Sequence, residues 1–566
     1  MKKTLSLLLV IVMLAVSLAG CGGIAIDADD KGAQINAYIT TEIRDFDPAN
    51  VMLDDSATKV FNLIYAGLVT LNDDGKVEYD LMKKYEIVFD ERLEENKMYI
   101  TLEETMWSDG RALTADDVIF AWKRILDPEF DSSAASLLYD IKNAREVKNG
   151  NCSVDDLGIA AVDNYILEVR FETATTDYDK FIERLASPAL VPLREDVVTR
   201  YEDWATSSSK MVASGPFSVK NLEFNKGFTL ERNTYYMRNR EKDNLDKYVK
   251  PYKINVSFKL DLEEQLQAFE EGTLFYLGDI PVANRADYKS KAKATDVASV
   301  HTYIVNSENE LLSKPEVRLA LSMALDRQAI ADLVVFAKPA TGFVPSMTTD
   351  KTAKDSFRKN GGDVISAAAD LEGAKELLAN AKVKGGSFTL SYLDGETEKA
   401  IADYAAKAWG ELGFTVKTKA LNNTKQLSNA YNDKNYDIIA VDTQMLSKDA
   451  FNAFASYAST FSGMGIDIQN GNYDIVGHVS GYASEEYDAL IENAYAAADR
   501  KAASEYLHQA EALLAKDMPV IPIVFNQDYY LINKKVLSGQ SIDYFGGKEF
   551  SDLNMKNYKK YLPVEQ

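Results

Sequence analysis

Histidine and cysteine are scarce in this sequence. Only His301, His478 and His508, with Cys21 and Cys152, occur among 566 residues. A zinc site built from these residue types needs about four ligands close together, and a disulfide framework needs paired cysteines. The scarcity argues against such metal sites, against a disulfide scaffold and against most histidine-based catalysis. We predict no metal and no cofactor.

Positive charge is in deficit. Lys and Arg number 63 against 87 Asp and Glu, which gives a formal net charge of −24. A chain of this charge repels a phosphate backbone, so we expect no nucleic-acid partner. Hydrophobic residues make up 46% and charged residues 27%, as in ordinary globular proteins. At roughly 100–200 residues per domain, the length predicts about three or four domains.

Sequence motifs of enzymes are missing. We find no H-E-x-x-H, G-x-S-x-G, Walker phosphate loop or G-x-G-x-x-G. Acidic pairs such as Asp116-Asp117 stand at predicted helix starts, where the helix dipole favours negative charge without any catalytic role. We therefore predict that the protein is not an enzyme. The alternative in that class is an exported hydrolase with an unrecognised carboxylate pair.

The first residues have the character of a targeting segment. Lys2 and Lys3 precede the uncharged, mostly apolar stretch 5–18, which is shorter than the about 20 residues of a spanning helix. Leu18-Ala19-Gly20-Cys21 resembles a bacterial lipobox. We expect residues 1–20 to be a signal peptide, Cys21 to carry lipid, and residues 21–27 to be a tether on the outer face of the cell membrane. An ordinary cleavage site is the alternative.

Cys152 is then the single cysteine of the body of the protein. A reactive thiol is one interpretation, and a plain unpaired thiol is the simpler one, since no histidine is near it in sequence.

The pattern between residues 387 and 441 is typical of an α/β protein. Alternating Phe388, Leu390 and Tyr392 predict a strand, and apolar residues at helical spacing over 398–412 predict a helix that Gly413 ends. Two further strands follow, at 414–416 and 436–441. A strand–helix–strand unit of this kind implies a parallel, right-handed crossover.

Helices with clear start signals occur elsewhere in the chain. Thr114 with Asp117 forms an acidic variant of the capping box, ahead of a helix that ends before Pro128, and Ser484 caps another. Apolar stripes predict two more helices, at 317–324 and 503–514. Trp107 and Trp122 are predicted to be packing residues.

Several motifs, in order, resemble one family. They are Asp47-Pro48, Tyr65-Ala-Gly-Leu68, the run Trp107–Pro128, Ser214-Gly-Pro-Phe217, Pro315–Arg327, Tyr436-Asp437, Tyr487–Ile491, Ala510-Glu511 and Pro519–Pro522. Together they are similar to the large extracellular solute-binding proteins of peptide ABC importers. The resemblance covers roughly residues 35–535.

The resemblance implies a two-lobed, periplasmic-binding-protein-like α/β fold of the large class, with an extra inserted domain. Lobe one (domain I) is expected at 28–70, 213–295 and 521–566, the inserted domain II at 71–212, and lobe two (domain III) at 296–520. The crossing segments near 300–306 and 519–525 are the expected hinge for closure around a ligand.

The expected ligand site departs from the family pattern. Peptide-binding members carry Gly-Trp, Asp-Tyr and Pro after the strand at 436–441, and their aspartate pairs with the ligand's ammonium group. Here the loop has no such motif. We predict Asp442, Thr443 and Gln444 as ligand contacts, with Asp449 the favoured ammonium partner over Asp442. On the other edge of the cleft we expect the backbone of 49–54 to pair with an extended ligand, with candidate contacts Met52, Leu53 and Asp54.

The resemblance implies a monomeric, lipid-anchored receptor that captures peptides and delivers them to the permease and ATPase subunits of an ABC importer. The alternative within the fold is a receptor for another solute, such as an oligosaccharide, an opine-like compound or a metal chelate.

Overall fold

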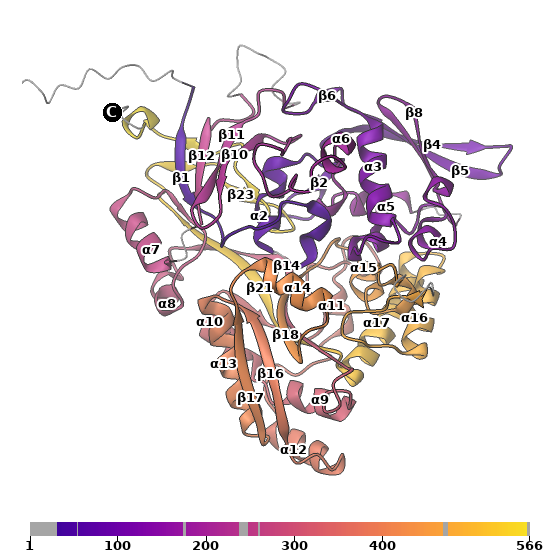
Figure 1. Ribbon diagram of the computed structural model, residues 1–566, viewed down its shortest axis with the longest axis vertical. Coiled ribbons are helices and arrows are strands. Elements are labelled where there is room, and N and C mark those ends of the chain that lie inside the picture. The colour runs from indigo at the N-terminus through magenta and orange to yellow at the C-terminus, as the bar shows by residue number, and fades with distance from the viewer. Residues whose placement is uncertain are drawn as a thin grey trace, which may run out of the picture.

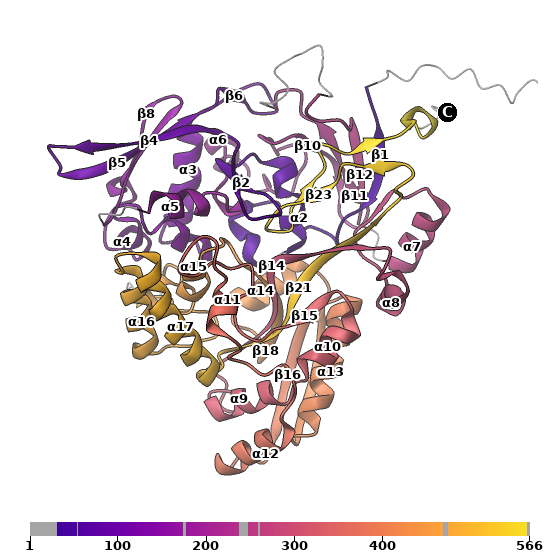
Figure 2. The ribbon, with the colours of Figure 1, turned by 180° about the vertical axis from the view of Figure 1, so that it is seen from behind.

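A computed structural model describes residues 31–53, 55–173, 177–236, 247–258, 261–467 and 474–562. It has two lobes, joined by the long strands β14 (Lys293–Val305) and β21 (Val520–Ile532) (Figure 1). We call residues 31–295 and 521–562 the upper lobe, and residues 296–520 the lower lobe. Seen from behind, the same two strands cross between the lobes (Figure 2).

One sheet of eleven strands runs through both lobes. Its order is β10-β11-β12-β1-β13-β21-β14-β18-β16-β17, with β15 paired to β21. Its other strands are β1 (Gln34–Tyr38), β10 (Phe217–Glu223), β11 (Gly227–Arg232), β12 (Lys253–Ser257), β13 (Tyr276–Leu277), β15 (Ala337–Pro339), β16 (Gly386–Leu393), β17 (Phe414–Leu421) and β18 (Ile438–Gln444).

The upper lobe adds a second, four-stranded sheet of order β4-β5-β9-β8. Its strands are β4 (Met82–Asp90), β5 (Glu95–Leu102), β8 (Ile159–Asp163) and β9 (Ile166–Arg170), and the hairpin of β4 and β5 projects from the body (Figure 1). The helices of this lobe are α2 (Asp55–Ile64), α3 (Ala115–Leu126), α4 (Ala144–Lys148), α5 (Tyr178–Arg184), α6 (Glu195–Val198), α7 (Leu262–Glu271) and α8 (Arg285–Tyr288).

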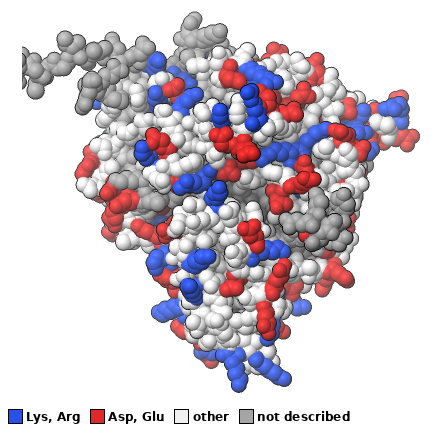
Figure 3. Space-filling view, viewed as in Figure 1, with Lys and Arg blue, Asp and Glu red and all other residues white. Residues whose placement is uncertain are grey.

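Short paired strands complete the upper lobe. They are β2 (Val69–Leu71) with β3 (Val77–Tyr79), β6 (Thr105–Met106) with β7 (Ala112–Leu113), β22 (Leu537–Ser538) with β25 (Asn554–Met555), and β23 (Ser541–Ile542) with β24 (Lys548–Glu549). Acidic and basic side chains are interspersed over the face seen in Figure 3.

The lower lobe contains the predicted crossover unit. β16, α13 (Glu396–Gly410), β17 and β18 follow one another, and β16 pairs in parallel with both β17 and β18. The other helices are α9 (Pro315–Met323), α10 (Arg327–Val334), α11 (Phe357–Gly361), α12 (Leu371–Asn380), α14 (Thr424–Asn432), α15 (Ala450–Ala455), α16 (Glu485–Tyr495) and α17 (Arg500–Asp517), and β19 (Ile466–Asp467) pairs with β20 (Asp474–Ile475).

Local start signals act as predicted. Thr114 and Asp117 form both hydrogen bonds of a capping box at α3, and the Ser484 side chain accepts from the Tyr487 amide at α16. Trp107 and Trp122 are fully buried, which confirms them as packing residues. In the described residues, no helix is both long and apolar enough to cross a bilayer.

The two joining strands position the region between the lobes. β14 pairs antiparallel with β21 and with β18, so His301 faces Asp442 across one strand pair and Val524 across the other. The register of β14 and β21 shifts beside His301, and such bulges re-aim side chains next to functional sites.

Candidate ligand cleft between the lobes

A cavity of about 420 Å³ lies between the lobes beside β14 and β21. This volume is within the range of about 300–1,000 Å³ typical of ligand pockets. The upper lobe contributes the end of β1, residues of α2 and the loop after β13, while the lower lobe contributes the loop after β16, the first turn of α13 and the strand β18. Its polar lining residues include Thr40, Ser56, Lys59, Asp279, Arg285, His301, Asp394, Glu396, Thr397, Glu398, Lys399, Asp442, Asn526, Gln527 and Asp528.

The predicted residue Asp442 lies in this cavity, near the end of β18. Its Oδ1 is 3.0 Å from Nδ1 of His301 and accepts a hydrogen bond of 2.8 Å from Nδ2 of Asn526. Burial opposes ionisation of the carboxyl, but His301 and these hydrogen bonds outweigh it, and the pKa of Asp442 is lowered. Asp442 is therefore an ionised carboxylate that lines the cavity.

A second carboxyl group, Glu398, enters the cavity from the first turn of α13. It is half-buried. Burial and the nearby Asp442 raise its pKa to about 7, and Asp279 adds to the rise, although the amide of Glu398 itself and His301 act in the opposite direction. Two carboxyl groups at one cavity therefore have pKa values that are shifted in opposite directions.

Most other charges of the cavity are held by fixed partners. Arg285 pairs with Asp279 at 3.1 Å and donates to Oγ1 of Thr397, 2.6 Å away in the lower lobe. Glu396 accepts from the amide of Val282 at 2.9 Å, which also links the two lobes. These contacts also join the two lobes at the wall of the cavity.

Thr443 and Gln444, also predicted, border a much smaller space of about 30 Å³. Gln444 is buried and its Nε2 donates to the carbonyl oxygen of Phe545 at 3.2 Å. Because this space holds little more than a water molecule, the end of β18 is closely packed here.

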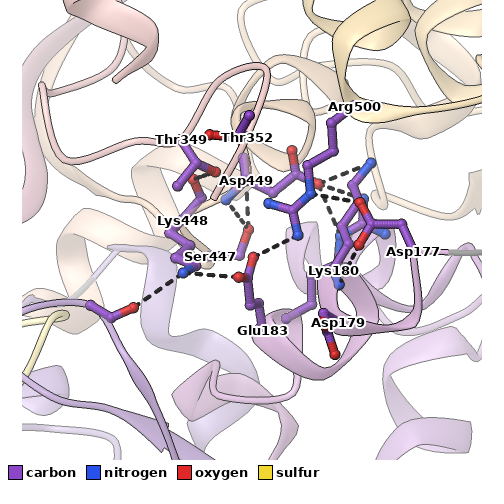
Figure 4. A network of polar contacts seen from close by, with 12 residues as sticks. Asp177, Asp179, Lys180, Glu183, Thr349, Thr352, Ser447, Lys448, Asp449 and Arg500 are labelled. Carbon is purple, nitrogen blue, oxygen red and sulfur yellow. Dashed lines mark hydrogen bonds and ion pairs between the residues drawn. The ribbon is translucent and has the colours of Figure 1, made fainter. Parts of the chain in front are cut away.

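Asp449 lies in a different environment, at the start of α15 (Figure 4). Its Oδ1 accepts from the amide of Phe451, and its Oδ2 is 2.7 Å from Arg184 and 3.3 Å from Lys180 of the upper lobe. Burial alone would raise the pKa of Asp449, but Lys180 and Arg184 hold it well below its usual range. Its carboxylate is a helix cap and an interlobe ion pair.

Asp449 belongs to a larger network of ion pairs. Lys448 pairs with Glu183 at 3.0 Å, and Arg500 contacts Glu183 at 2.9 Å and Asp177 at 2.7 Å. Each of these contacts joins the lower lobe to α5 or the residue that caps it in the upper lobe (Figure 4). We call the network around Asp449, Lys448 and Arg500 the interlobe ion-pair cluster.

Residues 49–54, predicted to form one edge of the cleft, do not have the extended backbone that was expected. The segment Pro48–Leu53 is a 3₁₀ helix, so it offers no extended backbone to pair with a ligand. Met52 and Leu53 are in this helix, and Asp54 lies outside the described residues. Asp45 and Asp47 begin the turn by accepting amide hydrogen bonds at 2.9 and 3.0 Å, a local pattern that signals a turn from sequence.

A second cavity of about 340 Å³ lies between the lobes on the other side of α2. It is lined by Arg44, Asp45, Asp47, Ala49 and Asn50, by residues 131–133, and by residues of α14. Asp47 is already bound by Arg124, in contacts of 2.5 and 3.0 Å. The space between the lobes is thus divided.

The structure describes one of the two cysteines. Cys21 lies outside the described residues. Cys152 is a half-buried free thiol whose pKa is raised by burial and by the nearby acids Asp156, Glu146 and Glu172, so it remains protonated at neutral pH. Within the described residues, no group of three or more His, Cys, Asp or Glu is arranged to hold a metal ion.

Glu398, His301 and Asn526 were not predicted as site residues. A signal for Glu398 was present, because it follows the strand predicted from Phe388, Leu390 and Tyr392. Ligands of open α/β sheets bind beyond the carboxyl ends of parallel strands, where β16 and β18 both end. His301 and Asn526 come from strands distant in sequence, and no local pattern marks them.

The fold and the cleft define a two-lobed binding protein. Residues 97–465 match the model of the bacterial extracellular solute-binding proteins, family 5 middle region, and the chain belongs to this family. It is 30% identical to the dipeptide-binding protein DppE of Bacillus subtilis over 87% of this chain and 86% of that protein. It is 28% identical to the oligopeptide-binding protein OppA of the same species, over 94% and 96%.

Solved structures show the same fold. The peptide-bound OppA of Listeria monocytogenes superposes with a TM-score of 0.78 at 22% identity, over 93% of this chain and 99% of that one.

Proposed function

We propose that the protein is a peptide receptor that captures its ligand between the lobes and delivers it to the permease and ATPase subunits of an ABC importer. The observation that carries the proposal is the cavity of about 420 Å³ lined by both lobes. A ligand that touches both lobes binds the closed form better and shifts the equilibrium between open and closed forms. Relatives named for binding dipeptides and oligopeptides support peptides as the ligand class.

Within this proposal, Asp442 pairs with the ammonium group of the ligand. It faces the cavity, whereas the carboxylate of Asp449 is already bound by Arg184 and Lys180. We propose Thr443, Gln444, Met52, Leu53 and Asp54 as further contacts only in an opened form, because the space beside Thr443 and Gln444 is too small for a residue. The hinge is assigned to residues 300–306 and 519–525, with the domain limits given above.

Small-angle scattering combined with calorimetry tests capture and closure. The protein is titrated with a mixture of short peptides, and each peptide is checked afterwards for cleavage by chromatography. We expect stoichiometric binding, a smaller radius of gyration and intact peptides. Binding with no change in shape contradicts capture between the lobes, and turnover of peptides supports the exported hydrolase.

Anchoring is proposed to depend on a lipid carried by Cys21. Stable attachment takes about two acyl chains, which a diacylated cysteine supplies. Cys21→Ser should release the protein from the membrane fraction or stall it as an uncleaved precursor. Wild-type protein that is wholly soluble in cell fractions prepared without detergent contradicts the anchor.

A further inference from the structure

The charges that line the cavity of about 420 Å³ are strongly unequal. Six carboxyl groups contribute, from Asp279, Asp394, Glu396, Glu398, Asp442 and Asp528, against the three basic side chains of Lys59, Arg285 and Lys399. A cavity with low-dielectric walls and an excess of one sign attracts the opposite charge. The balance after internal pairing decides which groups are left for a ligand.

Most of these charged groups are bound by partners within the protein. Arg285 neutralises Asp279, and Asp528 is bound by the fully buried Lys548. Lys399 points to Asp403 on the surface of α13, and Glu396 accepts an amide hydrogen bond from the upper lobe. Asp394 is exposed at the edge of the cavity, and Lys59 acts on Asp442, whose pKa it helps to lower.

Glu398, which is half-buried, is the exception among the acids of the cavity. Within the residues that the structure describes it takes part in no ion pair, and its hydrogen bond is to its own amide. It lies near Asp442, which is bound by His301 and the neutral amide of Asn526. Partial burial of a carboxyl group without a cation disfavours its charged form, and a cation that enters offsets this cost.

The remaining walls suit the carbon atoms next to such a cation. Tyr38, Phe336 and Tyr529 line the cavity, and the rings of Phe336 and Tyr529 stack at 4.0 Å. Aromatic walls cover the aliphatic stem of a basic side chain and attract its charged end.

We propose that Glu398 binds the positively charged side chain of a lysine or arginine in the ligand, beside the Asp442 carboxylate, so that the protein selects cationic peptides. The proposal rests on the proposed peptide-binding function and deepens it. The other source of such a cation is the α-ammonium group, which every free peptide carries and which Asp442 is proposed to bind; recognition of that group alone gives no preference for basic peptides. The two carboxyl groups come from the first turn of α13 and from β18.

The test is calorimetry with four tripeptides: Lys-Ala-Ala, norleucine-Ala-Ala, and the N-acetylated form of each. Norleucine has the carbon chain of lysine without its ammonium group. If the side chain is the cation, the lysine peptides bind about tenfold or more tightly than the norleucine peptides, acetylated or not. If the α-ammonium group is the only cation recognised, the free peptides bind more tightly than the acetylated ones and lysine has no advantage over norleucine, which overturns the side-chain site.

Glu398→Gln identifies the residue responsible. This change keeps the shape of the side chain and removes its charge, and we expect it to reduce the preference that wild type shows to about threefold or less. The matched control is Glu411→Gln, at the exposed opposite end of α13, which should keep the wild-type preference. Near-ultraviolet circular dichroism of both variants checks that they fold.

The outcomes separate this inference from the function on which it rests. Binding of all four peptides with equal affinity, or an unchanged preference in a folded Glu398→Gln protein, overturns the cation site while peptide binding stands. Failure of all four peptides to bind, together with no closure on the peptide mixture described above, overturns both.

Discussion

Asp442 and Asp449 are seven positions apart in one segment, yet they lie in opposite surroundings. Asp442 faces an open cavity and is bound by His301 and a neutral amide. Asp449 is bound by two cations of the upper lobe and also caps α15. This difference shows that the role of each carboxylate depends on which side chains of the other lobe lie next to it. Near β14 and β21 the lobes leave space, and at α5 they form ion pairs.

The largest expected effect concerns the interlobe ion-pair cluster. Arg184 is 1% exposed and bridges Asp449 and Asp140. Arg184→Met leaves these carboxylates without their buried partner, and we expect the free energy of unfolding to fall by about 3 kcal/mol or more. Denaturant unfolding measures this.

The control for that change is Arg92→Met on the projecting hairpin. Arg92 is exposed, and its substitution should alter stability by less than about 0.5 kcal/mol. Equal stability of the two variants would mean that the cluster does not hold the lobes together.

The next effect concerns binding rather than stability. Asp442→Asn removes the charge opposite the ligand's ammonium group, and loss of one partner of a desolvated pair costs about 2–5 kcal/mol. We therefore expect affinity for a free tripeptide to fall by about thirtyfold or more, while affinity for its N-acetylated form barely changes. Asp449→Asn should lower stability and leave the ratio of free to acetylated affinity as in wild type. If Asp449→Asn changes this ratio and Asp442→Asn does not, the ammonium site belongs to Asp449.

A smaller effect is the pH dependence of cation binding. Burial and the nearby Asp442 raise the pKa of Glu398 to about 7, so the group is largely protonated at pH 6 and ionised at pH 8. A cation binds the ionised form. Affinity for N-acetylated Lys-Ala-Ala, which has no α-amino group to titrate and whose lysine side chain stays charged, should rise about threefold to tenfold from pH 6 to pH 8. Calorimetry at the two pH values measures it, and in Glu398→Gln the rise should disappear. An equal rise in both proteins would assign it to another group.

The smallest effect is a gain in stability. The pKa of Glu398 is raised in the folded state from its ordinary value of 4.5 to about 7. Between these two pH values the carboxyl group ionises in the unfolded chain before it ionises in the folded one, so the free energy of unfolding falls as pH rises. Ligand-free Glu398→Gln should therefore be more stable than wild type at pH 8, by about 1 kcal/mol. Thermal unfolding should show the difference shrinking towards pH 4.5. A variant less stable than wild type at pH 8 contradicts the enclosed charge.

Local features of the fold were predictable from sequence. The alternation at Phe388–Tyr392 and the helical spacing that follows are short-range patterns, and β16, α13, β17 and β18 occur as predicted. The capping residues Thr114 and Ser484 act within one helical turn, which is why they can be recognised without tertiary structure.

The site was less predictable because its decisive contacts are long-range. The partners of Asp449, Arg184 and Lys180, are more than 260 positions away, and no periodicity links them. Asp449 was favoured over Asp442 as the ammonium partner, but in the structure its carboxylate caps a helix and pairs with Arg184. The 3₁₀ helix at Pro48–Leu53 was missed although Asp45 and Asp47 carry a turn signal.

Native mass spectrometry of the protein purified from its own cells tests the central claim most directly. The account predicts one bound mass per chain, identified by fragmentation as a peptide that carries a positive charge, and lost from Asp442→Asn. A stoichiometric ligand that is not a peptide, such as an oligosaccharide or a metal chelate, or a peptide retained equally by Asp442→Asn, would contradict it.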